Sequence, residues 1–457
     1  QSPLPPPFTL RLKLSLESNE SAEPWKLALA TTETESDLLI PAEIERLVRA
    51  NNAERTDQAN QKVSAYFRDN HPERNRLEAI KQTTVDEIDA TDLLIPTTLV
   101  MEEIATARET FILKRGDYRH LGEQVTATTP AILPEMPADE PRNRLGLARW
   151  LVDAGNPLTA RVTVNRFWQS LFGTGLVRTA DNFGAQGEAP SHAELLDWLA
   201  VEFVESGWDV KAMLRLLLTS ATYRQSSRLT PTLLARDAEN RLLARGPRFR
   251  LQAEFVRDQA LASSGLLVDT IGGPSVRPYH PPGLYEQVVS GSSADTYQLG
   301  QGDELYRRSL YTYWKRSVPN PAMLIFDAPF REMCTVRRSR TNTPLQALNL
   351  MNDPTYVEAA RCLAQRMLRE GGASRTEQLE FGFRLLLVRS PRPEEIESLL
   401  ATCTRMQDSF AADPESAKQL LQTGASKADT ELDPVELASM TAVACVLLNL
   451  DETVTKE

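Results

Sequence analysis

The spacing of apolar positions near the start of the chain is typical of β-structure. Residues 8–16 alternate apolar and polar side chains, which is the period of a half-buried strand. Residues 25–30 form a second short segment that we expect to pair with it. Because two strands do not form a stable sheet alone, we expect residues 1–40 to complete a sheet whose other strands lie upstream.

A charged helical pattern follows, and then an extended one. Residues 41–95 combine helical spacing with few apolar side chains and many charges, which predicts a solvated helical arm. Residues 96–141 return to extended character, with a turn signal at 115–117 and four prolines from Pro130 to Pro141. We expect this segment to be an extended linker or hairpin.

From residue 142 onward the spacing is helical. Asn156 and Pro157 precede a helix that Gly173 is placed to end. Ser191 and Glu194 match the capping-box pattern of the next helix, because each side chain can bond the other residue's amide. These signals predict a multi-helix globular domain over residues 142–457.

Later segments complete this prediction. Residues 210–223 are so apolar that we expect a mostly interior helix, and 265–303 should form a long loop region. Residues 308–314 predict a buried strand, with a short helix as the alternative. Three further helices should begin where an oxygen-bearing residue precedes proline, at Thr343, Asp353 and Asp433. The predicted fold class is therefore mainly α with long loops, preceded by a small β fragment and the charged arm.

Composition narrows the class of protein. The 457 residues are 41% hydrophobic and 25% charged, which excludes collagen-like, disulfide-stapled and wholly disordered chains. No apolar run approaches the roughly 18 residues of a membrane helix. The first residue is not Met and no signal segment follows it, so we expect the chain to begin inside a longer parent.

Charge is distributed unevenly along the chain. The net charge is −11, yet residues 111–376 carry a net +5 between two flanks of −8 each. Overall acidity argues against nucleic acid as a partner. The basic middle contains 29 Arg and 3 Lys, and Arg is suited to recognising carboxylate, phosphate or sulfate, or to forming structural ion pairs.

Metal and cofactor signals are missing from the sequence. The four cysteines are widely separated and match no zinc spacing, and the haem-attachment motif Cys-x-x-Cys-His does not occur. We therefore expect no metal and no cofactor in this chain.

Carboxylates offer one hypothesis for catalysis. Asp181 and Glu188 lie in a Gly-rich loop after an aromatic helix, and Glu254 lies on a later helix. With Trp168 or Trp198 as a sugar platform, these carboxylates would suit acid/base hydrolysis of a polysaccharide. The favoured alternative is that Trp168 is a core residue and Asp181 pairs with an arginine.

Arginine offers the other hypothesis, which is binding. Several guanidinium groups precede a helix start at Thr343, where free amides would add to an anion site. The helix ahead of Gly173 places further candidates on one face. The predicted ligand-binding residues are Arg161, Asn165, Arg166, Trp168, Arg337, Arg338, Arg340 and Asn342. Alternatively, carboxylates inside the fold or on the acidic flanks neutralise these arginines.

Longer motifs resemble a known family. They are NPLTARVTVNRFW from Asn156, FGTGLVRT from Phe172, PSHAELLDWL from Pro190, SATYRQSS from Ser220, and CTVRRSRTNTPLQALNLMNDP from Cys334. They resemble the planctomycete PSD domain, also called domain of unknown function 1553, over about residues 142–450. No catalytic residues carry over from this family.

The resemblance implies a context rather than a reaction. Such domains usually form the C-terminal part of large exported proteins, with an upstream planctomycete cytochrome c domain and sometimes a lectin-like β-sandwich. Residues 1–40 would then be the closing strands of that sandwich, and any haem would lie in an upstream domain. The resemblance implies an extracytoplasmic module, periplasmic or on the cell surface. We expect it to bind an anionic or sulfated glycan, or acidic upstream domains of the same parent, with a polysaccharide hydrolase as the alternative.

Overall fold

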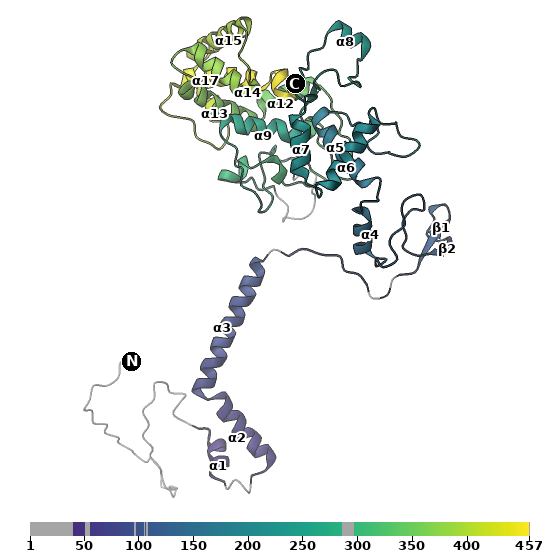
Figure 1. Ribbon diagram of the computed structural model, residues 1–457. Helices are drawn as coiled ribbons and strands as arrows, with labels where there is room; N and C mark the ends of the chain where they lie inside the picture. Colours follow the sequence, from purple (N-terminus) through teal and green to yellow (C-terminus); the bar gives the residue numbers. More distant parts are fainter. Residues whose placement is uncertain are drawn as a thin grey trace, which may run out of the picture. The chain divides into compact units, whose positions relative to one another are not determined.

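The computed structural model describes residues 40–50, 55–95, 97–104, 106, 108–285 and 297–456. The expected strands within residues 8–30 lie outside this range. The chain divides into two compact units, residues 1–107 and 108–457. The predicted mainly helical fold class is confirmed, with a small β fragment ahead of the helical region (Figure 1).

Within its described residues, the first unit contains three helices. They are α1 (Ala42–Arg49), α2 (Asp57–Asp69) and α3 (Pro72–Leu94). The side chain of Thr56 accepts a hydrogen bond from the amide of Ala59 at the start of α2. Lys62 on α2 pairs with Glu43 on α1 at 2.8 Å. Ile44 is the one buried side chain of these helices, so charge and helical propensity rather than a core determine their structure.

The second unit begins with a hairpin. Strands β1 (Thr110–Leu113) and β2 (Leu121–Val125) pair antiparallel across the turn predicted at 115–117. This hairpin belongs to the same compact unit as the helices that follow, although the sequence grouped it with the linker.

A first helical core surrounds α5 (Thr159–Phe172), between α6 (Ala193–Glu205) and α7 (Val210–Thr219). Val164, Leu199 and Phe203 are almost fully buried there. The short elements that neighbour these helices along the chain are α4 (Arg144–Leu151), α8 (Pro231–Arg236) and β3 (Phe249–Arg250).

A second core surrounds α13 (Pro354–Glu370), which packs against α17 (Pro434–Leu448) and α9 (Ala253–Ser264). Residues such as Ala360 and Leu363 on α13 and Val443 on α17 are completely buried. The other elements around this core are α11 (Pro321–Ile325), α12 (Pro344–Asn352), α14 (Arg375–Leu387), α15 (Pro393–Ala412), α16 (Pro414–Leu421), α18 (Asp451–Val454) and β4 (Thr455–Lys456). Among the described residues, no helix combines the length and the apolar composition that a membrane span requires.

The predicted helix starts at Pro344, Pro354 and Pro434 are correct. Gly173 ends α5 with a φ of 82°, a conformation that glycine adopts without strain. The start of α5 lies at Thr159, and the Asn156 side chain accepts hydrogen bonds from the amides of Leu158 and Thr159.

Three local predictions are wrong. The Ser191–Glu194 capping box does not form, because the Ser191 amide donates to the Leu176 carbonyl and α6 starts only at Ala193. Helix α7 ends at Thr219, and only Met213 and Leu217 on it are buried, because a single face of the helix meets the core.

The third wrong prediction is the strand at 308–314, where the alternative of a short helix is the correct one. This segment forms a short 3-10 helix, η5 (Ser309–Tyr311), followed by an isolated bridge between Thr312 and Val276. The Asp258 carboxylate accepts the Ser309 amide at 2.8 Å, which holds the segment in this turn.

A buried carboxylate joins three distant segments in the second core. Glu358 on α13 accepts hydrogen bonds from the hydroxyls of Tyr279 and Tyr306, each at 2.8 Å. It also accepts the amide of Ser426 at 2.6 Å and its hydroxyl at 2.7 Å. Because all four donors point at one carboxylate, this charge is well solvated by the protein itself.

Candidate functional site

The arginine-rich segment 331–342 is anchored to the fold at its C-terminal end. Asp327, which has a φ of 60°, accepts the amide of Thr341 at 2.8 Å and its hydroxyl at 3.0 Å. The same carboxylate forms an ion pair with Arg250 on β3. At the start of α12, the side-chain Nε2 of Gln346 donates to the Ile325 carbonyl at 2.9 Å. These bonds define where the arginines of the segment can reach.

Arg340 lies where three cavities meet. Its Nη1 donates to the carbonyl of Gly173 at 2.9 Å, and its guanidinium carbon lies 4.4 Å from the centre of the Phe249 ring. Arg340 lines all three of these cavities. Burial, together with the positive charge of Arg250, lowers the pKa of Arg340. The fold therefore holds the positive charge of Arg340 close to the like charge of Arg250, which repels it.

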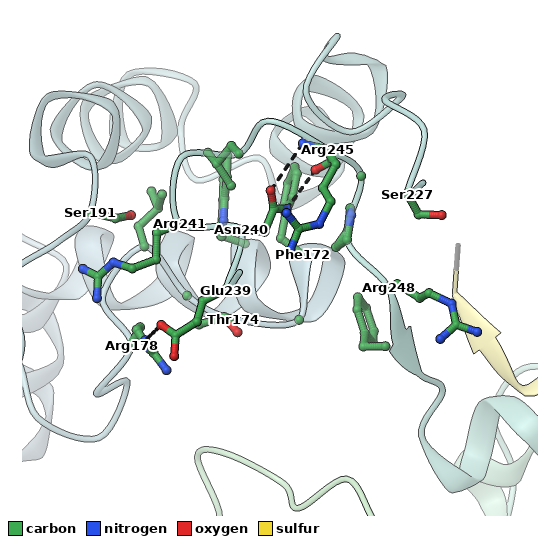
Figure 2. Close-up of a pocket in the computed structure, with 18 of the residues that line it drawn as sticks. Phe172, Thr174, Arg178, Ser191, Ser227, Glu239, Asn240, Arg241, Arg245 and Arg248 are labelled. Carbon is green, nitrogen blue, oxygen red and sulfur yellow. Dashed lines mark hydrogen bonds and ion pairs between the residues drawn. The ribbon is translucent and has the colours of Figure 1, made fainter. Parts of the chain in front are cut away.

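The first cavity has a volume of about 450 Å³ and lies between the end of α5 and residues 238–249 (Figure 2). Arg178 pairs with Glu239 at 2.5 Å on one side of it. Arg245 donates to the carbonyls of Asp237 and Ala238, at 2.9 and 2.7 Å, and meets no carboxylate in the described residues. Its remaining arginines are Arg241, Arg248 and Arg340.

The second cavity, of about 410 Å³, joins the two arginine-containing motifs of the sequence. Arg166 from α5 lines it together with Arg338 and Arg340 from the later segment. A hydrogen bond of 3.4 Å from Gln169 to the Val336 carbonyl holds the two segments side by side. Arg166 is exposed, and its guanidinium has no partner among the residues that the structure describes. The exposed thiol of Cys334 lies in the same lining.

The third cavity, also of about 410 Å³, lies at the N-terminal end of α12. Its charged lining residues are Arg248, Arg250, Arg340 and Asp451. Asn342 and Thr343 contribute polar groups. The expected free amides at the helix start are partly occupied, because Thr343 and Gln346 form a reciprocal capping box.

We call the residues that line these three cavities the Arg340 surface. Its arginines are Arg166, Arg178, Arg241, Arg245, Arg248, Arg250, Arg338 and Arg340. Only Glu239 and Asp451 are lining carboxylates. Glu188, Glu254 and Asp327 pair with Arg241, Arg338 and Arg250 from outside the lining.

The structure separates the predicted ligand-binding residues into two groups. The predicted residues that lie on the Arg340 surface are Arg166, Trp168, Arg338, Arg340 and Asn342. Arg161 instead pairs with Asp197 at 2.7 Å and lines none of the three cavities. Arg337 is exposed and also lies outside their linings.

Asn165 and Trp168 are buried residues of α5, and Trp168 also lines the first cavity. The Asn165 amide bonds the backbone of Val177 on both sides, donating to its carbonyl at 3.0 Å and accepting its amide at 2.9 Å. Trp168 is only 4% exposed and stacks on Phe172 with 4.0 Å between ring centres. A sugar platform needs an open ring face, which Trp168 lacks, whereas Trp198 is exposed.

The three candidate catalytic carboxylates lie outside the linings of the three cavities. Glu254 pairs with Arg338 at 2.7 Å. Glu188 lies 3.6 Å from Arg241 and 4.0 Å from Arg178. Asp181 is exposed and makes no ion pair within the described residues, so the predicted pairing with arginine is not seen.

Sequence reasoning missed the arginines between 241 and 250. Arg241, Arg245, Arg248 and Arg250 occur within ten residues, and this density was the available signal. Their partners come from distant segments, so the sequence did not show that this run meets Arg340. Among the described residues no group of three or more His, Cys, Asp or Glu side chains is placed to hold a metal ion. The four cysteines are free, and Cys334 is the exposed one.

Comparison with known proteins identifies a family. The family model PSD1, described as a protein of unknown function (DUF1553), matches residues 143–403, more than half of the chain. Every residue that lines the first two cavities falls inside this match, whereas the third cavity also uses residues 449–455. No curated protein and no solved structure matches the chain significantly.

Proposed function

We propose a binding function for this chain, which belongs to the PSD1 family of proteins of unknown function (DUF1553): the Arg340 surface binds a polyanion, such as an anionic or sulfated glycan. One observation carries the proposal. Arg340 lines three adjoining cavities and has no carboxylate partner among the described residues.

The wider charge balance supports the same ligand class. Arg166, Arg245 and Arg340 lack carboxylate partners in the described part of the surface, whereas each of the other five arginines lies near an acid. Three uncompensated charges beside low-dielectric walls attract an anion more strongly than dispersed surface charges do. Since the cavities adjoin at Arg340, a chain-like ligand carrying several anionic groups suits them better than one small anion.

Arginine also suits this role chemically. Its planar guanidinium presents several N–H donors to carboxylate, phosphate or sulfate oxygens. Phe249, over which Arg340 is stacked, restricts the motion of that side chain before a ligand binds. Less side-chain entropy is then lost on binding.

Titration of the full chain with dextran sulfate tests the proposal, with uncharged dextran as the reference ligand. We expect dextran sulfate alone to bind, with an affinity that falls as salt rises. Arg340→Gln should weaken binding about 10- to 100-fold, since a charge-assisted hydrogen bond contributes about 1.5–3 kcal/mol. The matched control is Arg405→Gln, an equal charge change on α15, outside the Arg340 surface. Equal binding of both dextrans, or equal losses in both variants, would overturn the proposal.

An acidic partner domain is the second candidate occupant of the Arg340 surface. The acidic flanks of the chain, −8 each, show that its own sequence carries suitable charge. Competition between dextran sulfate and poly-glutamate distinguishes the two. Displacement of bound dextran sulfate by poly-glutamate at comparable charge would favour the protein partner.

A polysaccharide hydrolase with paired carboxylates is the weaker proposal. Glu254 and Glu188 are engaged by arginines, and neither lines a cavity of the Arg340 surface. An acid/base pair needs two carboxyl groups facing one substrate site. Release of reducing ends from a panel of polysaccharides, lost in Asp181→Asn, would favour the hydrolase instead.

We further propose an extracytoplasmic location, on the basis of the family resemblance. Fractionation of cells that produce the full-length parent protein, followed by detection of this domain, tests that location. Recovery of the protein solely with a cytoplasmic marker enzyme would contradict it.

A further inference from the structure

Arg250 is a largely buried arginine, and part of its hydrogen-bonding capacity is unused within the described residues. Its side chain is 10% exposed, and its Nη2 forms an ion pair with Asp327. Its Nε and Nη1 are buried and have no hydrogen-bond partner in the part of the chain that the structure describes. Buried guanidinium donors are normally satisfied, so unpaired ones call for an explanation such as a missing ligand.

The third cavity is the space that Arg250 lines. Arg248 and Arg340 line it too, and Asn342 lies at its edge with an exposed side chain. The N-terminal end of the nine-residue helix α12 contributes to the same lining. A helix N-terminus favours negative charge, and Arg250 independently supplies buried donors for an anion.

The charge of this cavity limits what it accepts. Three arginines line it, Asp451 pairs with Arg248, and Asp327 pairs with Arg250. Arg340 therefore remains without an acid, which leaves a net charge of about +1. A ligand group with one negative charge neutralises the cavity, whereas a second negative charge would be repelled by Asp327 and Asp451.

We propose that the third cavity is a subsite for a singly charged oxyanion, such as a sulfate half-ester or a carboxylate, on the ligand of the Arg340 surface. This subsite rests on the proposed function, because it assigns one anionic group of the same polyanion. Arg250 donates to the oxyanion from the buried side, and Arg340 and Asn342 donate from the open side. The subsite therefore selects against phosphomonoesters, which carry nearly two charges at neutral pH.

The test uses three small probes on the full chain, measured by calorimetric titration at neutral pH. They are glucose 6-sulfate, glucuronic acid and glucose 6-phosphate. We expect at least one of the singly charged sugars to bind about fivefold more tightly than glucose 6-phosphate. Equal or tighter binding of glucose 6-phosphate, or binding of none of the three, would overturn the subsite.

Two variants locate the binding, since loss of the buried Arg250 side chain could unfold the protein. Arg250→Lys keeps the charge beside Asp327 but removes the guanidinium donors. Asn342→Ala changes an exposed side chain and leaves the fold intact. Both variants should bind the preferred probe about threefold more weakly or worse, and Arg405→Gln should bind it with unchanged affinity. If Asn342→Ala binds that probe as tightly as the native chain, the third cavity is not the subsite.

The outcomes for subsite and surface can be separated. If native protein binds dextran sulfate but shows no preference among the three probes, only the subsite fails. If dextran sulfate does not bind at all, the proposed function fails and the subsite fails with it.

Discussion

Arg338 donates a hydrogen bond to the carboxylate of Glu254, with 2.7 Å between Nη1 and Oε2. The two side chains come from positions 84 residues apart. Glu254 was a candidate catalytic acid and Arg338 a candidate ligand-binding residue, and the two side chains are paired with each other. The Glu254 carboxylate therefore partly neutralises the positive charge that Arg338 contributes to the second cavity.

Removing this carboxylate charge should strengthen polyanion binding. Glu254→Gln leaves the shape nearly unchanged but frees the charge of Arg338, so we expect about two- to fivefold tighter binding of dextran sulfate. Titration at low salt measures the gain. Glu397→Gln on α15 makes the same charge change outside the Arg340 surface and serves as the control. A loss of affinity in Glu254→Gln would show that Arg338 needs its partner for correct placement.

Glu358 should contribute strongly to stability. The Glu358→Gln side chain still fills the site, but its amide nitrogen faces hydroxyl and amide donors, and the charge of the completely buried Arg361, 3.7 Å away, loses its counterpart. Breaking a buried pair in this way costs about 3–5 kcal/mol. Urea denaturation measures the free energy of unfolding, with Glu397→Gln as the surface control. A difference below about 1 kcal/mol would mean that this network adds little to stability.

Gly175 should not tolerate a side chain. A Cβ atom at this position would lie 2.6 Å from the Asn165 amide nitrogen and 2.6 Å from the Val177 carbonyl oxygen. Gly175→Ala would therefore push apart the two hydrogen bonds that close the loop after α5, at a cost of about 1–3 kcal/mol. Thermal unfolding compares it with Thr174→Ala, an exposed neighbour. An unchanged melting temperature would show that the loop shifts freely.

Stability should depend on pH through Glu395. Hydrogen bonds from Arg389 and then Arg392 hold the pKa of Glu395 well below its usual value of 4.5. A depressed carboxyl pKa stabilises the fold above the unfolded pKa, and this contribution is lost as pH falls through the folded value.

Glu395→Gln tests this dependence. Relative to the native chain, it should be less stable at about pH 7, and the difference should shrink by about pH 3. Chemical denaturation at both pH values measures the two differences. A difference that stays constant would assign the effect to packing instead of charge.

The sequence predicted best what is decided locally. The proline-capped starts of α12, α13 and α17 need only adjacent residues, so short motifs were sufficient. The Ser191 capping box failed because a carbonyl fifteen positions earlier, that of Leu176, accepts the Ser191 amide. Rules based on adjacent residues do not include a hydrogen-bond acceptor from so far along the chain.

The site was predicted in part for the same reason. The segment 331–342 was identified from its arginines, and two of them line the cavities. Asn165 and Trp168 share a helix face with Arg161, but that face turns toward the core, which periodicity alone does not reveal. The run 241–250 was missed because its role depends on contacts with Gly173, Arg340 and Asp451, all remote in the sequence.

The pairing of β3 with β4 has a consequence for biosynthesis. Arg248 and Asp451 form an ion pair across 203 positions of the chain, and Leu251 donates its amide to the Val454 carbonyl at 2.8 Å. At translation speeds of about 5–20 residues per second, the ribosome needs roughly 10–40 s between the two segments. During that interval β3 and its arginines lack their partner β4, so the third cavity is incomplete in the nascent chain. A chaperone or an anion can therefore bind the exposed arginines before the cavity forms.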